Sequence, residues 1–149
     1  MEKMSAMREA SPIRVFIADS NPLVQQTLIR LLKSESDIDV CGVAGNYEQL
    51  FRRLDSTAVD ILILDLDGAD MHGLELVREL TQKYPGLPIL GISMRDETFY
   101  ARQMIDAGGR GYLMKQDAAN KMMEAIRTVL KIGIYLNDAV RRKMNVERR

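Results

Sequence analysis

The sequence contains only one cysteine and no surplus of charge of either sign. Cys41 has no second cysteine with which to form an intramolecular disulfide, and its apolar neighbours Val40 and Val43 indicate a structural residue in a strand. Lys plus Arg and Asp plus Glu both number 21, so the formal net charge is zero. A domain that binds nucleic acid by itself usually has a basic surplus. The composition therefore argues against such a domain.

Long hydrophobic runs and phosphate-binding loops are also missing. The longest aliphatic run, residues 61–64, is far too short to span a membrane, and residues 1–11 lack the apolar core of a signal peptide. We therefore expect a soluble, cytoplasmic protein without a membrane partner. Neither GxxxxGK[ST] nor GxGxxG occurs, which disfavours a nucleotide-binding α/β enzyme.

Short apolar stretches alternate with amphipathic stretches five times along the chain. We predict strands at residues 13–18, 39–44, 58–64, 88–92 and 111–114. Each is followed by apolar residues at helical spacing, near residues 22–32, 50–54, 74–80, 98–107 and 118–130. Asn21 and Pro22 suit the N-cap and first position of a helix. The alternation predicts a single α/β domain, a doubly wound five-stranded parallel sheet with helices on both faces.

Polar side chains of complementary chemistry follow four of these strands. Asp19 follows the first strand, Asp65 the third, Ser93 the fourth and Lys115 the fifth. Ligands bind beyond the carboxyl ends of such strands, so we expect the four residues to meet at one edge. Two carboxylates can hold Mg²⁺, an ammonium can neutralise a transferred anion, and a hydroxyl can donate to a phosphoryl oxygen. Taken alone, Ser93 and Lys115 would more often be turn, cap or solvated loop residues, and Asp65 would be one about as often as not, so the prediction depends on the set.

These motifs together resemble the receiver domain of bacterial response regulators, especially the NarL/FixJ subfamily, which precedes a LuxR-type helix-turn-helix. The resemblance covers about residues 12–138 and is carried by residues 13–19, 21–24, 59–66, 73–76, 93–94, 107–115 and 133–136. It implies a flavodoxin-like fold with strand order 2-1-3-4-5. We expect a flexible leader at residues 1–11, the receiver domain at residues 12–138, and a basic linker or frayed helix end at residues 139–149 leading to an absent output domain.

The resemblance also implies roles and partners. Asp65 would be the phosphoacceptor, Lys115 the partner of the phosphoryl group, Ser93 the switch hydroxyl and Tyr112 the aromatic switch. Such a module is a phosphoacceptor in two-component signal transduction, not a conventional enzyme, although weak autophosphatase chemistry is compatible with it. A sensor histidine kinase would donate the phosphoryl group, the chain would form a homodimer, and DNA would be contacted only through the output domain in transcriptional regulation.

The metal pocket is where the sequence departs most from the family. The resemblance implies Mg²⁺ binding by Asp19, Asp65 and the backbone carbonyl of Asp67. The family's second acid after the first strand is here Ser20, a weak ligand, and Asp67 stands where the subfamily commonly has a basic or amide side chain. We expect weak Mg²⁺ binding, and an Asp67 side chain on the phosphoryl side that slows phosphorylation.

Two further departures from the family lie between Asp65 and Gly73. Ala69 replaces a family proline, and His72 replaces the usual Asp before Gly73. We interpret His72, the only histidine, as a solvated residue at a helix start and not as a phosphorelay residue. The Ser20 substitution keeps an alternative function open, a pseudo-receiver with the same fold that would act as a phosphorylation-independent dimerisation or docking module.

Overall fold

The computed structural model describes residues 11–68, 73–95, 97–136 and 141–142. Most of the expected leader and of the expected basic tail, together with Ala69 and His72, lies outside the described residues, so those expectations stay predictions. Within the described part of the chain, no helix is long and apolar enough to cross a membrane.

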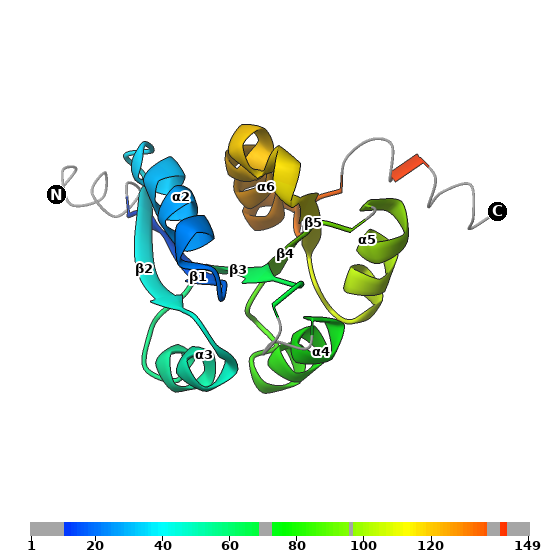
Figure 1. Ribbon diagram of the computed structural model, residues 1–149, viewed down its shortest axis with the longest axis horizontal. Helices are drawn as coiled ribbons and strands as arrows, with labels where there is room; N and C mark the ends of the chain where they lie inside the picture. The colour runs from blue at the N-terminus through cyan, green and yellow to red at the C-terminus, as the bar shows by residue number, and fades with distance from the viewer. Residues whose placement is uncertain (1–10, 69–72, 96, 137–140, 143–149) are drawn as a thin grey trace, which may run out of the picture.

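Five parallel strands form one sheet at the centre of the molecule (Figure 1). They are β1 (Ile13–Ala18), β2 (Ile38–Ala44), β3 (Ile61–Asp65), β4 (Ile89–Ser93) and β5 (Gly111–Met114). Their order across the sheet is β2-β1-β3-β4-β5, as predicted. The chain therefore changes its direction of travel between β1 and β3, which pair side by side at the centre of the sheet. The crevice beyond this point is where such folds bind ligands.

Helices cover both faces of the sheet. In chain order they are α2 (Pro22–Lys33), α3 (Tyr47–Leu54), α4 (Gly73–Lys83), α5 (Glu97–Asp106) and α6 (Ala118–Ile132), with a short 3₁₀ turn, η1 (Lys115–Asp117), before the last. One face carries α2 and α6 and the other carries α3, α4 and α5 (Figure 1). Each helix turns its apolar stripe inward, and β3 and β4 are buried along their whole length. The predicted doubly wound α/β fold is confirmed.

The ends of the helices follow the local sequence. The Asn21 side chain accepts hydrogen bonds from the backbone N–H groups of Leu23 and Val24, and Pro22 occupies the first turn, as predicted. Helix α6 ends at Gly133, whose φ of 92° lies in the left-handed region that glycine adopts at no steric cost. The first cap starts α2 directly after the end of β1, and the second ends α6.

Three predicted strands differ from the structure at their limits. Strand β4 covers Ile89–Ser93 instead of residues 88–92, and β3 extends to Asp65 instead of residue 64. Strand β2 begins one residue earlier, at Ile38, and β3 begins at Ile61 instead of residue 58. The segment before β3 is held by Arg14 of β1: Asp60 accepts the Arg14 N–H through its carboxylate at 2.8 Å, and Arg14 Nε donates to the carbonyl of Ala58. These bonds align the segment beside β1 before regular pairing begins. Cys41 lies within β2, half-buried against the core and in no disulfide, in agreement with its predicted structural role.

Candidate functional site

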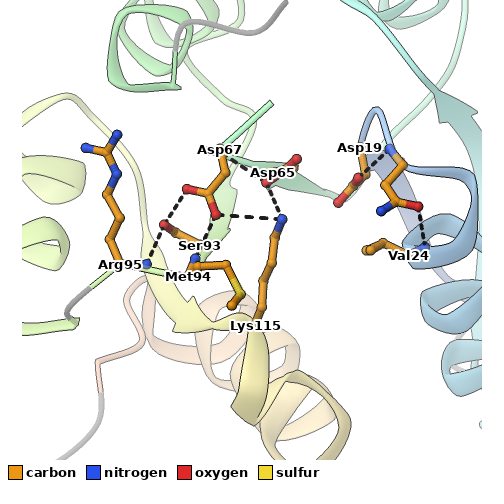
Figure 2. Close-up of polar contacts among 9 residues, drawn as sticks. Asp19, Val24, Asp65, Asp67, Ser93, Met94, Arg95 and Lys115 are labelled. Carbon is orange, nitrogen blue, oxygen red and sulfur yellow. Dashed lines mark hydrogen bonds and ion pairs between the residues drawn. The ribbon is translucent and has the colours of Figure 1, made fainter. Parts of the chain in front are cut away.

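The carboxyl ends of four strands bring polar residues to one edge of the sheet. Asp19 follows β1, Asp65 ends β3, Ser93 ends β4, and Lys115 follows β5. Because β3 pairs with β1 and β4, and β4 with β5, these four ends are adjacent in space (Figure 2). Asp19, Asp65 and Ser93 are the buried polar residues among those described. The predicted convergence is therefore observed, and it is built from residues that are far apart in the sequence.

Lys115 is the cation of this edge. Its Nζ atom lies 2.9 Å from Oδ1 of Asp65 and 3.7 Å from Oδ2 of Asp67. Burial acts to lower the pKa of Lys115, but the hydrogen bond to Asp65 and the charges of Asp65, Asp19 and Asp67 outweigh it, so the pKa is raised. The amine stays protonated throughout the physiological range, and it faces the only carboxylate at the end of a fully buried strand.

Asp19 carries an oxygen without a partner. Oδ1 accepts the backbone N–H of Asn21 at 2.8 Å, whereas Oδ2 is buried and has no hydrogen-bond partner among the described residues. Burial is the largest cause of a raised pKa for this carboxyl group; the Asn21 hydrogen bond opposes it and the charge of Asp65 adds to it. A buried anionic oxygen in this position is suited to a cation.

The carboxylates of Asp19 and Asp65 can bind a hard divalent cation, although they do not enclose it on all sides. Mg²⁺ is commonly held by one or two carboxylates and keeps several waters. Ser20 is exposed, and the described residues contain no group of three acidic, histidine or cysteine side chains that could enclose a metal. The donor set thus fits a loosely held Mg²⁺, and the expected ligation by the Asp67 carbonyl and Ser20 stays a prediction.

The hydrogen-bond partners of the Asp67 side chain were not predicted from the sequence. Its side chain was expected on the phosphoryl side, but its partners were not foreseen: Ser93 Oγ donates to Oδ1 at 2.7 Å, and the backbone N–H of Met94 donates to Oδ2 at 2.7 Å. Its own N–H donates to Oδ1 of Asp65 at 3.0 Å. The spacing of two residues from Asp65 was the available signal, but the register between β3 and β4 decides which groups the side chain meets.

Tyr112, the predicted aromatic switch, is fully buried in β5. Its hydroxyl donates to the backbone carbonyl of Arg95 at 3.0 Å, and its ring packs against that of Tyr100 with centroids 5.7 Å apart. The N–H of Arg95 donates in turn to Ser93 Oγ at 3.0 Å. The backbone of Arg95 therefore connects the Ser93 hydroxyl with the Tyr112 ring.

Comparison with known proteins places this geometry in a family. Residues 15–127 match the response regulator receiver domain. Among curated proteins, the nitrate/nitrite response regulator protein NarP of Escherichia coli (strain K12) is 30% identical over 84% of this chain and 58% of its own length. The DNA-binding transcriptional activator DevR/DosR of Mycobacterium tuberculosis is 31% identical over 81% of this chain and 54% of its own length. The chain thus spans little more than half the length of these relatives.

Solved structures share the fold. A LuxR-family two-component response regulator from Aurantimonas sp. SI85-9A1 superposes with a TM-score of 0.83 at 24% identity, over 93% of this chain and 99% of that one. The isolated receiver domain of RcsB from Salmonella enterica serovar Typhimurium gives a TM-score of 0.81 at 23% identity, over 89% of this chain and 98% of that one. With the family match over residues 15–127, this chain belongs to the response regulator receiver domain family.

Proposed function

We propose that this chain is a phosphorylation-controlled receiver in which Asp65 accepts the phosphoryl group. The observation that carries the proposal is a buried carboxylate paired with a cation: Asp65 is 3% exposed at the end of β3, and Lys115 Nζ lies 2.9 Å from its Oδ1. Asp19 is the other carboxylate buried at this edge, and it lies outside hydrogen-bond reach of Lys115 in the described contacts. Asp65 is therefore the acid best placed to carry a group that Lys115 can neutralise.

The proposed chemistry is phosphoryl transfer from a phosphohistidine of a sensor histidine kinase. A carboxylate oxygen of Asp65 attacks phosphorus, so that a P–O bond forms while the P–N bond breaks and the imidazole keeps the electron pair. Lys115 offsets the negative charge of the phosphoryl oxygens, and Ser93 is the hydroxyl donor on the same side. Bound Mg²⁺, held by Asp19, Asp65, the Asp67 carbonyl and weakly by Ser20, would supply further positive charge.

The proposed output is transcriptional. The relatives include a transcriptional regulatory protein, DegU of Brevibacillus brevis, of which this chain covers 58%. We propose that the receiver controls a helix-turn-helix output in the cytoplasm. We also propose that it works as a homodimer, through α5, β5 and α6 or through α2 and α6; a solved structure of RcsB contains two dimers bound to DNA. Sedimentation across a concentration series, with and without a phosphoryl mimic, tests this, and a monomer under both conditions would contradict it.

Labelling with a small phosphodonor tests the assignment of Asp65. Incubation with acetyl phosphate and Mg²⁺ should add one phosphoryl group to the protein, seen by mass spectrometry, and none to Asp65→Asn. Asp60→Asn is the matched control, because Asp60 is an exposed acid that precedes the same strand and should leave labelling intact. Retention of the label in Asp65→Asn would contradict the assignment.

A pseudo-receiver is the second candidate, and one observation favours it. Ser93 and the Met94 N–H already donate to Asp67, so both donors are engaged in the absence of a phosphoryl group. A protein that takes no label from acetyl phosphate at any Mg²⁺ concentration, and that still self-associates, would support this alternative.

A further inference from the structure

One carboxylate gathers three anion-binding groups at the candidate site. Asp67 Oδ1 accepts from Ser93 Oγ at 2.7 Å, and Asp67 Oδ2 accepts from the Met94 N–H at 2.7 Å and lies 3.7 Å from Lys115 Nζ (Figure 2). A hydroxyl, a backbone amide and an ammonium thus converge on Asp67 from the ends of β4 and β5. We call these three groups the cradle.

The cradle has the composition of a site for oxygens of a phosphoryl group. If Asp65 accepts a phosphoryl group, as proposed above, the new oxygens extend from Oδ1 or Oδ2 of Asp65 toward Lys115, which already contacts both acids. A serine hydroxyl has one proton to donate, and a backbone amide has one. In this structure both are donated to Asp67, so a phosphoryl oxygen can use them only after Asp67 gives them up.

The same contacts continue to the buried tyrosine. Ser93 Oγ, while donating to Asp67, accepts the N–H of Arg95 at 3.0 Å, and the carbonyl of Arg95 accepts the hydroxyl of Tyr112 at 3.0 Å. Asp67 therefore fixes the orientation of the Ser93 hydroxyl, and Ser93 helps to position the backbone that Tyr112 binds. The engaged cradle and the fully buried Tyr112 ring belong to one hydrogen-bonded chain.

We propose that Asp67 is the resident anion of the cradle: its carboxylate holds Ser93, Met94 and, through Arg95, Tyr112 in the anion-bound arrangement without any phosphoryl group. This inference rests on the proposed function in treating the cradle as the phosphoryl-oxygen site. It assigns Asp67 a regulatory role: the switch is held by the chain itself, and an incoming phosphoryl group must displace a carboxylate of like charge.

Two variants and a matched control isolate this role. Asp67→Asn keeps the shape and an acceptor oxygen but removes the charge, whereas Asp67→Ala empties the cradle. Glu75→Gln is the control, because Glu75 is an exposed acid that lines the same surface hollow as Asp67 and makes none of the described contacts with the cradle. It reports what a loss of negative charge does by itself.

The ligand-free proteins are compared first. In Asp67→Ala we expect the Met94 amide to exchange with solvent about tenfold faster, in line with one lost charge-assisted hydrogen bond, and the Tyr112 ring resonances to shift. Glu75→Gln should leave both unchanged, and Asp67→Asn should lie between. Met94 exchange and Tyr112 resonances that are the same in Asp67→Ala as in the unmodified protein would overturn the proposal.

Binding of beryllium trifluoride with Mg²⁺ is the second comparison. We expect it to bind about tenfold more tightly to Asp67→Asn and Asp67→Ala, to restore slow Met94 exchange in Asp67→Ala, and to change that amide little in the unmodified protein. Equal affinity in all four proteins would overturn the displacement. If no protein bound the mimic, the phosphoacceptor role of Asp65 would fail, and the ligand-free comparison would still decide whether Asp67 holds the switch.

Discussion

Replacing Asp19 with asparagine should make the metal-free protein more stable at neutral pH. The carboxylate has no exposed surface, and its Oδ2 lacks a hydrogen-bond partner among the described residues. Burial raises the pKa of Asp19; the Asn21 hydrogen bond opposes this effect, and the Asp65 charge adds to it. Burial therefore makes the ionised form of Asp19 more costly in the folded protein than in the unfolded chain.

The sign of the pH dependence follows from the direction of this shift. Because the pKa of Asp19 in the folded protein lies above its ordinary value of 3.8, the folded state binds this proton more tightly than the unfolded state. The destabilisation is fully present above the folded-state pKa and disappears as the pH falls toward 3.8. Asparagine is neutral throughout and keeps the oxygen that accepts from Asn21. The Nδ2 amide of asparagine would take the place of the unpartnered Oδ2, so the gain comes from removing a buried charge; we expect Asp19→Asn to gain about 1–2 kcal/mol in the free energy of unfolding.

Urea unfolding in the presence of EDTA measures this difference, at about pH 7 and again at about pH 5, where the advantage should be smaller. Asp106→Asn is the control, since Asp106 is an exposed acid whose removal should change stability by less than about 0.5 kcal/mol. Saturating Mg²⁺ should stabilise the unmodified protein and leave Asp19→Asn nearly unchanged. A variant that is less stable than the unmodified protein in EDTA at neutral pH would refute the reasoning.

Three other changes test separate parts of the structure. Ser20→Asp adds a carboxylate beside Asp19. Coulomb attraction over about 4 Å is worth about 1 kcal/mol in water and about 4 kcal/mol at lower dielectric. Because Ser20 is exposed, we expect a gain near the lower end, which is roughly five- to tenfold in Mg²⁺ affinity measured by calorimetry. Unchanged affinity would mean that another group already fills the pocket. The hydrogen bond from Arg127 is the main reason that the pKa of Asp37 is lowered, so Arg127→Ala should return this pKa toward its ordinary value in an NMR titration. The ion pair is exposed, and the stability that it provides is present above pH 3.8 and lost as the pH falls through the folded-state pKa of Asp37. An unmoved Asp37 titration would contradict the contact. Gly42→Ala would place Cβ 2.3 Å from Phe16 Cε2 and should lower the free energy of unfolding by about 1–3 kcal/mol in thermal melts. Gly86→Ala, where nothing lies within 4 Å of the new Cβ, should not lower it. Equal melting temperatures for the two variants would show that Phe16 moves aside freely.

Sequence reasoning reached the fold because its signals are local and consistent. The limits of β1 and β5 agree with the prediction, since Asp19 and Lys115 directly follow apolar runs. The start of β3 was misplaced because hydrogen bonds from Arg14, a residue distant in sequence, align residues 58–60 without regular strand pairing. Apolar composition alone does not distinguish a segment that pairs as a strand from one that is only aligned beside a strand.

Residue spacing likewise predicted which groups reach the site but not all of their contacts. The edge that holds Asp19, Asp65 and Lys115 follows from parallel strands and their order. The bonds from Ser93 and Met94 to Asp67 depend on the pairing of Asp65 with Ile92 and on the turn that follows Asp65. Register and turn geometry arise only when the sheet assembles, so the resident carboxylate was visible only in the structure.

The order of the strands has a consequence for how the protein is made. Lys115 follows Asp65 by 115 − 65 = 50 residues, so at roughly 5–20 residues per second it leaves the ribosome about 3–10 s later. During that interval β1, β2 and β3 can pair, and they bring Asp19 and Asp65 together with no lysine between them. Two carboxylates at one edge repel each other, so we expect such a three-stranded arrangement to be weak until the lysine is present. Lys115, which directly follows the last strand of this sheet, supplies the positive charge, so the site is completed only when the sheet is complete.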